Sequence, residues 1–498
     1  MTQADFDICV IGGGINGAGI ARDAAGRGMK VLLVEAQDIA GATSSASTKL
    51  IHGGLRYLEY YEFRLVKEAL KEREVLMNLA PHIIRPLEFI LPHDENLRPA
   101  WMIRAGLFLY DHLAGRKKLK PSRGMHLSGH EAGTPLQDKY WQAFSYSDCW
   151  ADDARLVVLN AMDAAERGAV IMTRTACTAM ERDGNIWRLR LQDMASGQEF
   201  THTAAMTVNA TGPWVRGFLD ALDLSSAETP QIRLVKGSHI VIPRLYDGDH
   251  AYILQQPDRR IVFAIPFQEK FTLVGTTEVG FENDPSVAAI EQQEIDYLCT
   301  AINRSFKTQI TPEHIVWTYS GVRPLLADEN DNATAATRDY QIILDRSFGP
   351  PTLSVFGGKI TTYRKLAEQA LDELCGGKPW TATEVLPGGN IADFDDFLKT
   401  QTTRYSWLPP ALVERYTRTY GTRMDVFLDN SKSTNDLGRH LGDNLYEAEI
   451  YYLVGAEWAR TTEDILWRRT KLGLHISADT KHNLDVALPT IMRKVLAA

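Results

Sequence analysis

Three glycines near the start of the chain, Gly12, Gly14 and Gly17, stand in G-x-G-x-x-G order. In this order the first glycine permits a tight turn, the second lets a pyrophosphate approach the backbone, and the third lets the next helix pack closely on the strand. Glu35 ends the following apolar segment, where a carboxylate can accept hydrogen bonds from an adenosine ribose and disfavours a 2′-phosphate. These residue types at this spacing predict nucleotide binding, whereas a plain strand-to-helix turn is the alternative.

The elements around these glycines are those needed to position them. Residues 6–11 are a short apolar run with β-branched members, which predicts a buried parallel strand. Residues 18–28 favour a helix, and residues 30–34 predict a second strand that leads into Glu35. The helix N-terminus offers free N–H groups and a partial positive charge to phosphates. Small residues at Ala21 and Gly28 extend the pattern and favour FAD over NAD.

Two further segments could complete the same site. Residues 41–48 are small or carry hydroxyls and follow the acid-terminated strand, where a dinucleotide would continue, although a solvated surface loop is the alternative. Residues 351–358 predict a buried strand ending in two glycines, followed by a helix with Thr361 or Thr362 as N-cap. This second corner suits the electron-rich edge of a flavin ring. Residues 55–77 predict one long amphipathic helix.

Length and composition bound the class of protein. The 498 residues allow two or three domains, and 44% hydrophobic with 23% charged residues is ordinary for a globular protein. A formal charge of −9 argues against a nucleic-acid partner. The first residues lack the pattern of a secretory signal, and no apolar run reaches the ~20 residues of a membrane span. The five scattered cysteines predict reduced thiols in the cytoplasm and no metal site.

The order of predicted strands and helices along the chain predicts three domains. The expected fold class is α/β, with a Rossmann-like FAD-binding domain, an interleaved α+β substrate domain built on an antiparallel sheet, and a C-terminal all-α cap. We expect a discontinuous FAD-binding domain over residues 1–80, 141–230 and 345–380. The substrate-binding domain is expected over residues 81–140 and 231–344, and the cap over residues 387–498. The cap is interpreted as a stabilising or dimerising bundle without chemistry, so a homodimer is one expected assembly.

Several motifs recur in register with one known family. The segments GGGINGAGIARDAAGRG, TSSASTKLIHGGLRYLE, NATGPW, VKGSHIV, WTYSGVRPL, TRDY and FGGKITTYRKLAE appear in this order. The chain thereby resembles the FAD-dependent glycerol-3-phosphate dehydrogenases, in particular the bacterial aerobic, quinone-reducing members. The match runs over nearly the whole chain without a departure inside these segments. The resemblance implies oxidation of glycerol 3-phosphate to dihydroxyacetone phosphate by hydride transfer to FAD, with electrons passed to a membrane quinone.

The resemblance also implies a set of site residues. The substrate site is expected to include Arg56, Tyr57, Arg323, Arg338, Lys359 and Thr361. The FAD site is expected to include Gly12, Gly14, Ile15, Asn16, Gly17, Glu35, Ala36, Thr43, Ser44, Ser45, Lys49, His52, Gly53, Ala176, Ala210, Gly212, Gly358, Lys359, Ile360 and Thr361. Arginine suits the phosphate because its planar fork pairs two oxygens at once. For Arg323 and Arg338 a surface salt bridge is the alternative interpretation.

A base must take the hydroxyl proton when a secondary alcohol is oxidised. His239 is our first choice and His52 the rival, because an imidazole titrates near neutrality while arginine stays protonated. Arg323 is expected to bind the phosphate or the alkoxide. The sequence does not separate the two histidines, and a purely structural histidine stays open.

One helix outside the nucleotide pattern has an unusual composition. Residues 97–120 place Trp101, Phe108 and Leu109 on one broad apolar face, and a basic run of Arg116, Lys117, Lys118 and Lys120 follows. Such a helix can dock on an anionic bilayer, here the inner face of the cytoplasmic membrane, and give access to a quinone. A core helix beside a solvated basic loop is the alternative.

Other functions remain open at this point. A soluble glycerol-3-phosphate oxidase would pass the electrons to oxygen, and a D-amino-acid-oxidase-like enzyme would oxidise an amine on the same fold. A protein that only binds FAD, for sensing or assembly, is the non-enzyme alternative.

Overall fold

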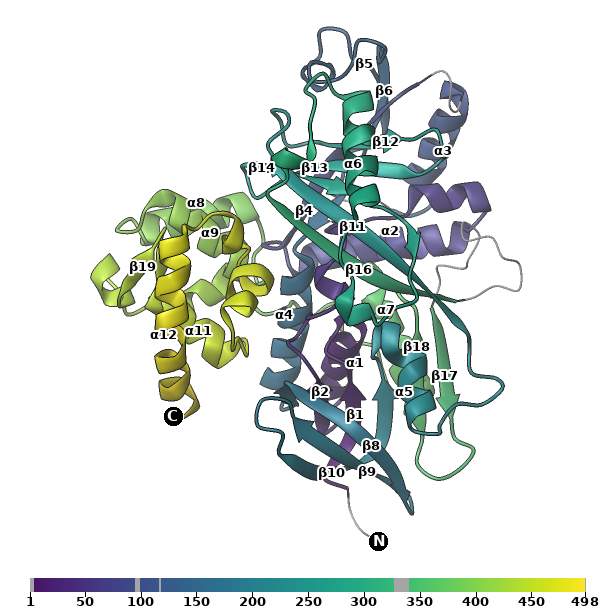
Figure 1. Ribbon diagram of the computed structural model, residues 1–498, viewed down its shortest axis with the longest axis vertical. Coiled ribbons are helices and arrows are strands. Elements are labelled where there is room, and N and C mark those ends of the chain that lie inside the picture. The colour runs from purple at the N-terminus through teal and green to yellow at the C-terminus, as the bar shows by residue number, and fades with distance from the viewer. Residues whose placement is uncertain (1–3, 95–98, 116–117, 327–339, 498) are drawn as a thin grey trace.

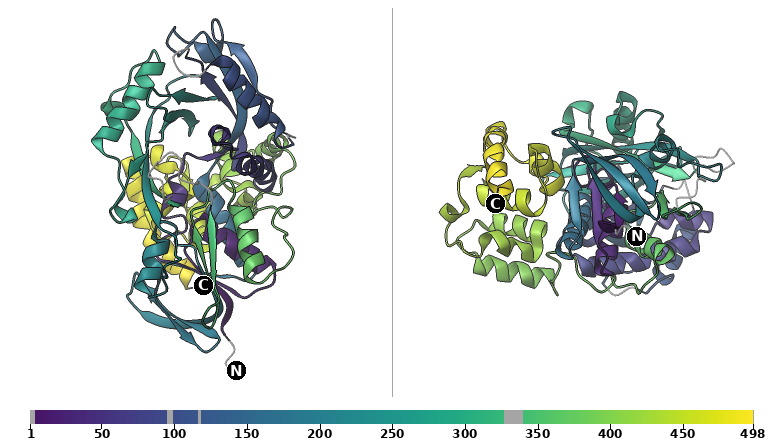
Figure 2. Two further views of the ribbon diagram at one scale, coloured as in Figure 1. Left: turned by 90° about the vertical axis from the view of Figure 1, so that its right-hand side faces the viewer. Right: turned by 90° about the horizontal axis from the view of Figure 1, so that it is seen from below.

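The computed structural model describes residues 4–94, 99–115, 118–326 and 340–497. Arg116, Lys117 and Arg338, which the sequence analysis names, lie outside these ranges. The chain folds into a lower part that contains the N-terminus, an upper part built on a second large sheet, and a C-terminal helical part at one side (Figure 1). The right-hand view of Figure 2 shows the C-terminal helices beside the other two parts.

The first sheet carries the nucleotide motif. Its order is β17-β18-β10-β1-β2-β7, and the hairpin of β8 and β9 extends it through β9 to β10. The pairings β18–β10–β1–β2–β7 are parallel, and a helix over Ile15–Gly26 forms the crossover between β1 and β2. The strands are β1 (Phe6–Ile11), β2 (Val31–Glu35), β7 (Val170–Thr173), β8 (Thr175–Asp183), β9 (Ile186–Asp193), β10 (Glu199–Asn209), β17 (Gln341–Asp345) and β18 (Thr352–Phe356).

Helices cover one face of this sheet and the β8–β9 hairpin the other. Helix α1 (Ile15–Gly26) lies between α4 (Asp153–Glu166) and α7 (Tyr363–Leu374). Apolar side chains of β1, such as Ile8 and Val10, pack in the core with these helices. Alternate residues of the same strand, such as Cys9, pack against Trp187 of β9. A short helix, α5 (Val215–Ala221), packs near β18.

The second sheet forms the upper part. Its order is β15-β11-β14-β13-β12-β4-β6-β3, with β16 paired to β11 and β5 to β6. All its pairings are antiparallel except β12 with β4. The strands are β3 (Leu50–Ile51), β4 (Ile84–Pro92), β5 (Arg123–His126), β6 (Gln142–Ala151), β11 (Ile232–Pro243), β12 (Ala251–Gln255), β13 (Ile261–Phe267), β14 (Phe271–Gly275), β15 (Val279–Gly280) and β16 (Trp317–Leu326).

Helices also cover the two faces of the second sheet. Helix α6 (Gln292–Ser305) packs on one face with a core that includes Ile240 and Val274. Helices α2 (Phe63–Leu79) and α3 (Ala100–His112) pack on the other face, beside Phe89 and Phe144. The fold class predicted from the sequence is confirmed, with an α/β nucleotide domain, a second domain built mainly on antiparallel strands, and a helical C-terminal part.

The predicted domain limits differ from the strand pairing at two places. Strand β6 lies in the range assigned to the FAD-binding domain, yet it pairs with β4 along nine residues of the second sheet. Strand β17 lies almost wholly in the range assigned to the substrate-binding domain, yet it pairs with β18 in the first sheet. A helix begins directly after β6, which makes it resemble part of a βα unit, whereas β17 is followed by another strand, β18. In both cases only the long-range pairing decides the sheet.

The single helix predicted over residues 55–77 is wrong. The structure has a 3₁₀ turn at Leu55–Tyr60 and then α2 from Phe63. Tyr61 between them is left-handed, with φ of +61°. A bulky residue rarely takes this conformation, so the sequence pattern contains no breaker signal there.

The C-terminal part is helical with one small hairpin. It comprises α8 (Phe394–Arg404), α9 (Pro410–Tyr420), α10 (Asp425–Leu428), α11 (Glu447–Ala456) and α12 (Ala478–Leu496), with β19 (His440–Gly442) and β20 (Leu445–Tyr446). A π-helical segment, Asp464–Arg469, faces the nucleotide domain. There Arg469 donates to Asp38 at 2.7 and 2.8 Å, both groups being buried. Among the described residues, none of the helices has the length and apolarity to cross a bilayer.

Candidate active site

The first glycine corner leaves no space for side chains. Gly12 has φ of +110°, and a Cβ on Gly17 would lie 1.9 Å from the Gly12 carbonyl oxygen. Gly14 is the N-cap of α1 and supplies no side-chain cap to the helix. The Ile15 N–H donates to Ser44 Oγ at 3.0 Å, which ties the hydroxyl-rich loop to the helix start. The corner therefore brings the backbone and the start of helix α1 to where phosphates would lie.

Glu35 lies beside this corner at the end of β2. Its carboxylate accepts hydrogen bonds from the N–H groups of Gly13 at 2.6 Å and Gln37 at 2.8 Å. Burial raises its pKa, while these two donors favour the ionised form. The role of this carboxylate as the acceptor for a ribose stays a prediction.

The second glycine corner meets the first across the helix starts. Asn16 of α1 donates from Nδ2 to the carbonyl of Gly357 at 3.1 Å. Its Oδ1 is a buried acceptor without a hydrogen-bond partner. A buried polar atom of this kind indicates a missing donor. Asn16 thus fits a ligand that carries hydrogen-bond donors between the two corners.

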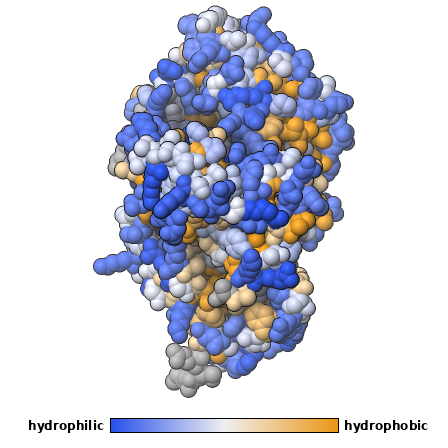
Figure 3. Space-filling view, turned by 90° about the vertical axis from the view of Figure 1, so that its left-hand side faces the viewer, coloured by the Kyte–Doolittle hydropathy of each residue, from blue (hydrophilic) through white to orange (hydrophobic). Residues whose placement is uncertain are grey.

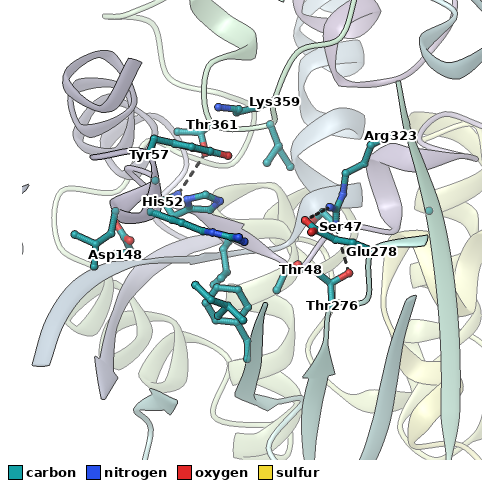
Figure 4. A pocket seen from close by; sticks show the side chains of 18 of the residues that line it. Ser47, Thr48, His52, Tyr57, Asp148, Thr276, Glu278, Arg323, Lys359 and Thr361 are labelled. Atoms are coloured by element: carbon teal, nitrogen blue, oxygen red, sulfur yellow. Dashed lines mark hydrogen bonds and ion pairs between the residues drawn. The ribbon is translucent and has the colours of Figure 1, made fainter. Parts of the chain in front are cut away.

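A cavity of about 360 Å³ opens between the two sheets beside both corners. Its wall includes the predicted site residues Ile15, Thr43, Ser44, His52, Arg56, Tyr57, Arg323, Gly358, Lys359, Ile360 and Thr361. Apolar side chains of the second sheet, among them Phe89, Ile253 and Phe263, line another part of it. The structure thus brings together residues from the loop after β2, β16 and the second glycine corner (Figure 4).

Cationic side chains approach the cavity from two sides. Arg323 donates from Nη2 to Thr276 Oγ1 at 3.1 Å, and its Nη1 lies 3.6 Å from Glu278. Lys359 lies above the ring of Tyr57, with its Nζ 4.0 Å from the ring centroid. Figure 4 shows Arg323 and Lys359 separated across the cavity. This arrangement can hold a phosphorylated substrate between them, because both groups carry positive charge.

The hydroxyl-rich loop is fixed by a buried ion pair. Lys49 Nζ lies 2.7 Å from Asp153 and also donates to the Ser45 carbonyl at 2.8 Å. The same carboxylate oxygen accepts from Ser47 Oγ at 2.7 Å. Burial lowers the pKa of Lys49, and the attraction of Lys49 and other donors keeps the pKa of Asp153 low. Lys49 therefore holds the loop in shape from behind the cavity.

The two candidate bases occupy different positions. His52 lines the cavity, and its backbone N–H donates to Thr361 Oγ1 at 3.3 Å. His239 is not among the cavity-lining residues: it is 1% exposed, stacks on Tyr319, and contacts Thr48 Oγ1 through Nε2 at 2.9 Å. Burial, Lys49 and Arg323 lower the pKa of His239 well below its usual value. The first choice from the sequence thus lies behind the wall and its rival lies in it.

The other predicted cofactor residues lie around the cavity rather than on its wall. Ala210 donates its N–H to the Ile11 carbonyl at 2.8 Å beside the first corner, and Gly212 begins the next turn. Ala36 follows Glu35 on a groove facing the C-terminal part. Ala176 lies in the β8–β9 hairpin, next to Arg174, whose N–H donates to the Gln37 carbonyl. Gly53 is buried against Tyr110 and Asp148.

The set of site residues expected from the sequence leaves out part of the cavity wall. Asp148 lines the cavity from β6, and Glu278 and Thr276 flank Arg323. Asp148 carries no local signal, because its position depends on the pairing of β6 with β4. Thr276 and Glu278 follow β14 directly, and a polar cluster at a strand end is a signal that could have indicated them.

The site fits a dinucleotide bearing a flavin. The first corner has the backbone for a pyrophosphate, Glu35 the acceptor for a ribose, and Asn16 a free acceptor where the second corner begins. Within the described residues there is no cluster of three His, Cys, Asp or Glu side chains able to hold a metal ion. The fold and the cavity together define a flavoprotein oxidoreductase.

Comparison with known proteins agrees with this class. Residues 7–364 match the family of FAD dependent oxidoreductases, and residues 379–497 match the C-terminal domain of alpha-glycerophosphate oxidase. The aerobic glycerol-3-phosphate dehydrogenase of Escherichia coli is 52% identical, over 96% of each chain. The D-erythritol 1-phosphate dehydrogenase of Brucella abortus is 50% identical, over 95% of each chain.

A solved structure extends the comparison to the fold. The glycerol-3-phosphate dehydrogenase of Bacillus halodurans, complexed with FAD, superposes with a TM-score of 0.78 at 26% identity, covering 100% of this chain and 92% of that one. The chain belongs to the glycerol-3-phosphate dehydrogenase family of FAD-dependent oxidoreductases. The family and the cofactor expected from the sequence motifs are confirmed.

Proposed function

We propose that this enzyme oxidises sn-glycerol 3-phosphate to dihydroxyacetone phosphate. The observation that carries the proposal is the cavity itself, whose wall includes Arg323, Arg56 and Lys359 beside the two glycine corners. A phosphate monoester needs such cations, and an amino acid substrate would not need three. The named activity of the relatives at about half identity supports the same substrate.

Each side chain has a role in this reaction. Bound FAD supplies the acceptor for the hydrogen and electron pair that leave C2 of the substrate. Arg323 and Arg56 hold the phosphate or stabilise the alkoxide, and Lys359 lies where substrate and flavin would meet. His52 takes the hydroxyl proton, because it lines the cavity while His239 is enclosed behind Thr48. Thr361 holds the backbone of His52.

The proposal is tested by reducing the purified enzyme under nitrogen. Glycerol 3-phosphate should bleach the visible absorbance of the bound flavin, and glycerol with inorganic phosphate should not. Bleaching by D-amino acids instead would move the chain to amine oxidation. A flavin that no alcohol or amine reduces would support a protein that only binds the cofactor.

A second substrate has a specific observation in its favour. The relative that acts on D-erythritol 1-phosphate is nearly as similar to this chain as the glycerol-3-phosphate enzymes are. The longer polyol phosphate therefore serves as the competing substrate. The ratio of the two kcat/KM values decides between them, and a ratio in favour of the tetritol phosphate would replace our choice.

For the electron acceptor we propose a membrane quinone reached from the surface of α3. This helix exposes Trp101 by 71%, Met102 by 46%, Phe108 by 54% and Leu109 by 44%. The 3₁₀ turn at Leu55–Tyr60, which contacts α3 and lines the cavity, ends beside Tyr61, exposed by 80%. Several large exposed apolar side chains on one helix and the turn beside it favour a lipid or protein contact.

The position of this surface supports a peripheral location on the inner face of the cytoplasmic membrane. Lys118 and Lys120, the described part of the basic run, are exposed at its flank. Helix α3 lies away from the C-terminal part (Figure 1), whose own face is largely hydrophilic with scattered apolar side chains (Figure 3). Cations beside an apolar surface favour an anionic bilayer.

Liposome binding tests this location. Trp101→Ser with Phe108→Ser should lower co-sedimentation with anionic liposomes and lower the rate with a long-chain quinone, while a soluble dye acceptor is reduced normally. Val426→Ser with Val486→Ser, two exposed apolar residues of the C-terminal part, is the matched control. Unchanged binding of the α3 variant would remove this surface. Fast oxygen use without a quinone would indicate a soluble oxidase.

A further inference from the structure

The turn that carries His52 is held by a buried side chain outside the cavity wall. The N–H of Gly53 donates to the phenol oxygen of Tyr110 at 2.9 Å and lies 3.2 Å from Asp148 Oδ1. Tyr110 is on α3 and is 3% exposed. A single hydroxyl thus joins a helix of the second domain to the backbone next to the candidate base.

The Tyr110 hydroxyl acts as acceptor and donor at once. It accepts from Gly53 and donates to Asp148, with oxygen separations of 2.7 and 2.8 Å to the two carboxylate oxygens. Asp148 is also paired with Arg73 Nη1 at 2.5 Å, and both side chains are 2% exposed. Burial and the Asp148 carboxylate raise the pKa of Tyr110, so the phenol keeps the proton that it donates. Hydrogen bonds thus connect Gly53, Tyr110, Asp148 and Arg73 in one buried chain.

The atoms packed around Gly53 leave no space for a side chain. A Cβ at this position would lie 2.5 Å from the Tyr110 oxygen and 2.4 Å from Leu70 Cδ2. On one side of Gly53, the His52 N–H donates to Thr361 at the second glycine corner. On the other side, Gly54 leads into the turn that bears Arg56 and Tyr57. Hydrogen bonds to Thr361 and Tyr110 therefore fix the His52–Gly54 turn. The positions of His52, Arg56 and Tyr57 in the cavity depend on it.

We propose that Tyr110 is a positioning residue for the oxidation reaction. Its hydroxyl sets the His52–Gly54 turn, and through it the placement of His52, Arg56 and Tyr57 against the substrate. Asp148, seen beside His52 in Figure 4, orients that hydroxyl and is itself oriented by Arg73. The inference rests on the proposed function for the roles of these three residues, and on the hydrogen bonds alone for the position of the turn.

Removal of the hydroxyl is the sharpest test. Tyr110→Phe keeps the ring and leaves Gly53 with only the longer contact to Asp148. Tyr252→Phe is the matched control, because Tyr252 is also buried in the second domain. Its hydroxyl donates to the Ala132 carbonyl at 2.7 Å, and Tyr252 does not line the cavity. Both FAD-loaded variants should keep the same FAD content and melting temperature. Tyr110→Phe alone should lower kcat/KM by about 10–100-fold, since small misplacements at a reacting centre are costly.

A second readout separates this inference from the proposed function. Hydrogen–deuterium exchange of the peptide covering residues 50–60 should be faster in Tyr110→Phe than in Tyr252→Phe, whatever the substrate is. Asp148→Asn probes the same link from its other end and replaces Tyr110→Phe if that variant does not accumulate. The double variant should be no slower than Asp148→Asn, because both changes act on one N–H.

Two results would overturn the inference. One is equal exchange of residues 50–60 and equal kcat/KM in Tyr110→Phe and Tyr252→Phe. The other is full additivity of Tyr110→Phe and Asp148→Asn. Wild-type flavin that glycerol 3-phosphate does not reduce would instead reject the proposed function, and the exchange result would still stand.

Discussion

Trp467 of the C-terminal part stacks on Trp317 of β16, with ring centroids 4.3 Å apart and planes inclined by 25°. Trp317 in turn lies 4.9 Å from Tyr319, which stacks on His239. The same strand carries Arg323 into the cavity. Nearby, Lys471 of the C-terminal part lies 3.3 Å from Asp152, next to the Asp153 that binds Lys49. The C-terminal part therefore supports the wall of the site from behind.

Trp467→Ala should loosen this support. Loss of a large, partly buried ring removes apolar contact area, so we expect the free energy of unfolding to fall by about 2–4 kcal/mol. The change is measured by denaturation in urea, with release of the flavin as the signal. Trp141→Ala is the control, because Trp141 is 45% exposed on the second domain. An unchanged midpoint for Trp467→Ala would contradict a supporting role.

Acid should destabilise the folded protein through His82. This side chain is buried against Gly388 and Gly421, and neither ring nitrogen has a hydrogen-bond partner. Burial, with a contribution from Arg155, lowers its pKa from 6.5 to about 3. Between these values the unfolded chain binds a proton and the folded chain does not. The free energy of unfolding should therefore fall as pH falls, by about 2 kcal/mol from pH 6.5 to pH 5.

His82→Phe should remove this slope. The variant and the wild type are compared by urea denaturation across that pH range, with His482→Phe at an exposed position as control. Identical slopes in all three proteins would show that His82 does not titrate on unfolding.

Arg323→Lys should weaken substrate binding although the substitution keeps the positive charge. Lysine cannot reproduce the planar fork that pairs two phosphate oxygens and also donates to Thr276. We expect KM to rise by about 10–100-fold, with a smaller change in kcat, if Arg323 contacts the phosphate. An equal loss in kcat and kcat/KM would assign Arg323 to the alkoxide in the transition state instead. Steady-state rates with a dye acceptor make the distinction.

The two histidines should separate clearly. His52→Gln should lower kcat by about 10²–10⁴ if His52 is the base. His239→Gln should affect stability more than rate, because His239 is enclosed by Tyr319 and Thr48. Both are measured as single-turnover flavin reduction, with flavin content checked first. The opposite order of effects would return the role to His239.

Local patterns predicted the parts of the site that are themselves local. Gly12, Gly17 and Glu35 follow one another in a single strand–helix–strand unit, so spacing alone places them together. The Gly357–Gly358 corner has the same character at the start of α7. In both places steric and electrostatic requirements act over a few residues.

Other features depend on contacts that spacing does not contain. Strand β6 carries Asp148 to the cavity only because it pairs with β4. Tyr110 meets Gly53 through the packing of α3 on the second sheet. His239 alternates on β11 with residues that face α6, and the strand register decides that it lies behind Thr48. The break at Tyr61 has no glycine or proline to indicate it.

The interleaved order of the first sheet also governs how the protein is made. Strand β10 lies between β1 and β18, so a cradle begun at Gly12 is finished by residues around Gly358. Most of the chain must be synthesised before both glycine corners are present to bind the flavin. Until then the hydroxyl-rich loop and the start of helix α1 lack the second glycine corner, which Asn16 contacts in the finished fold.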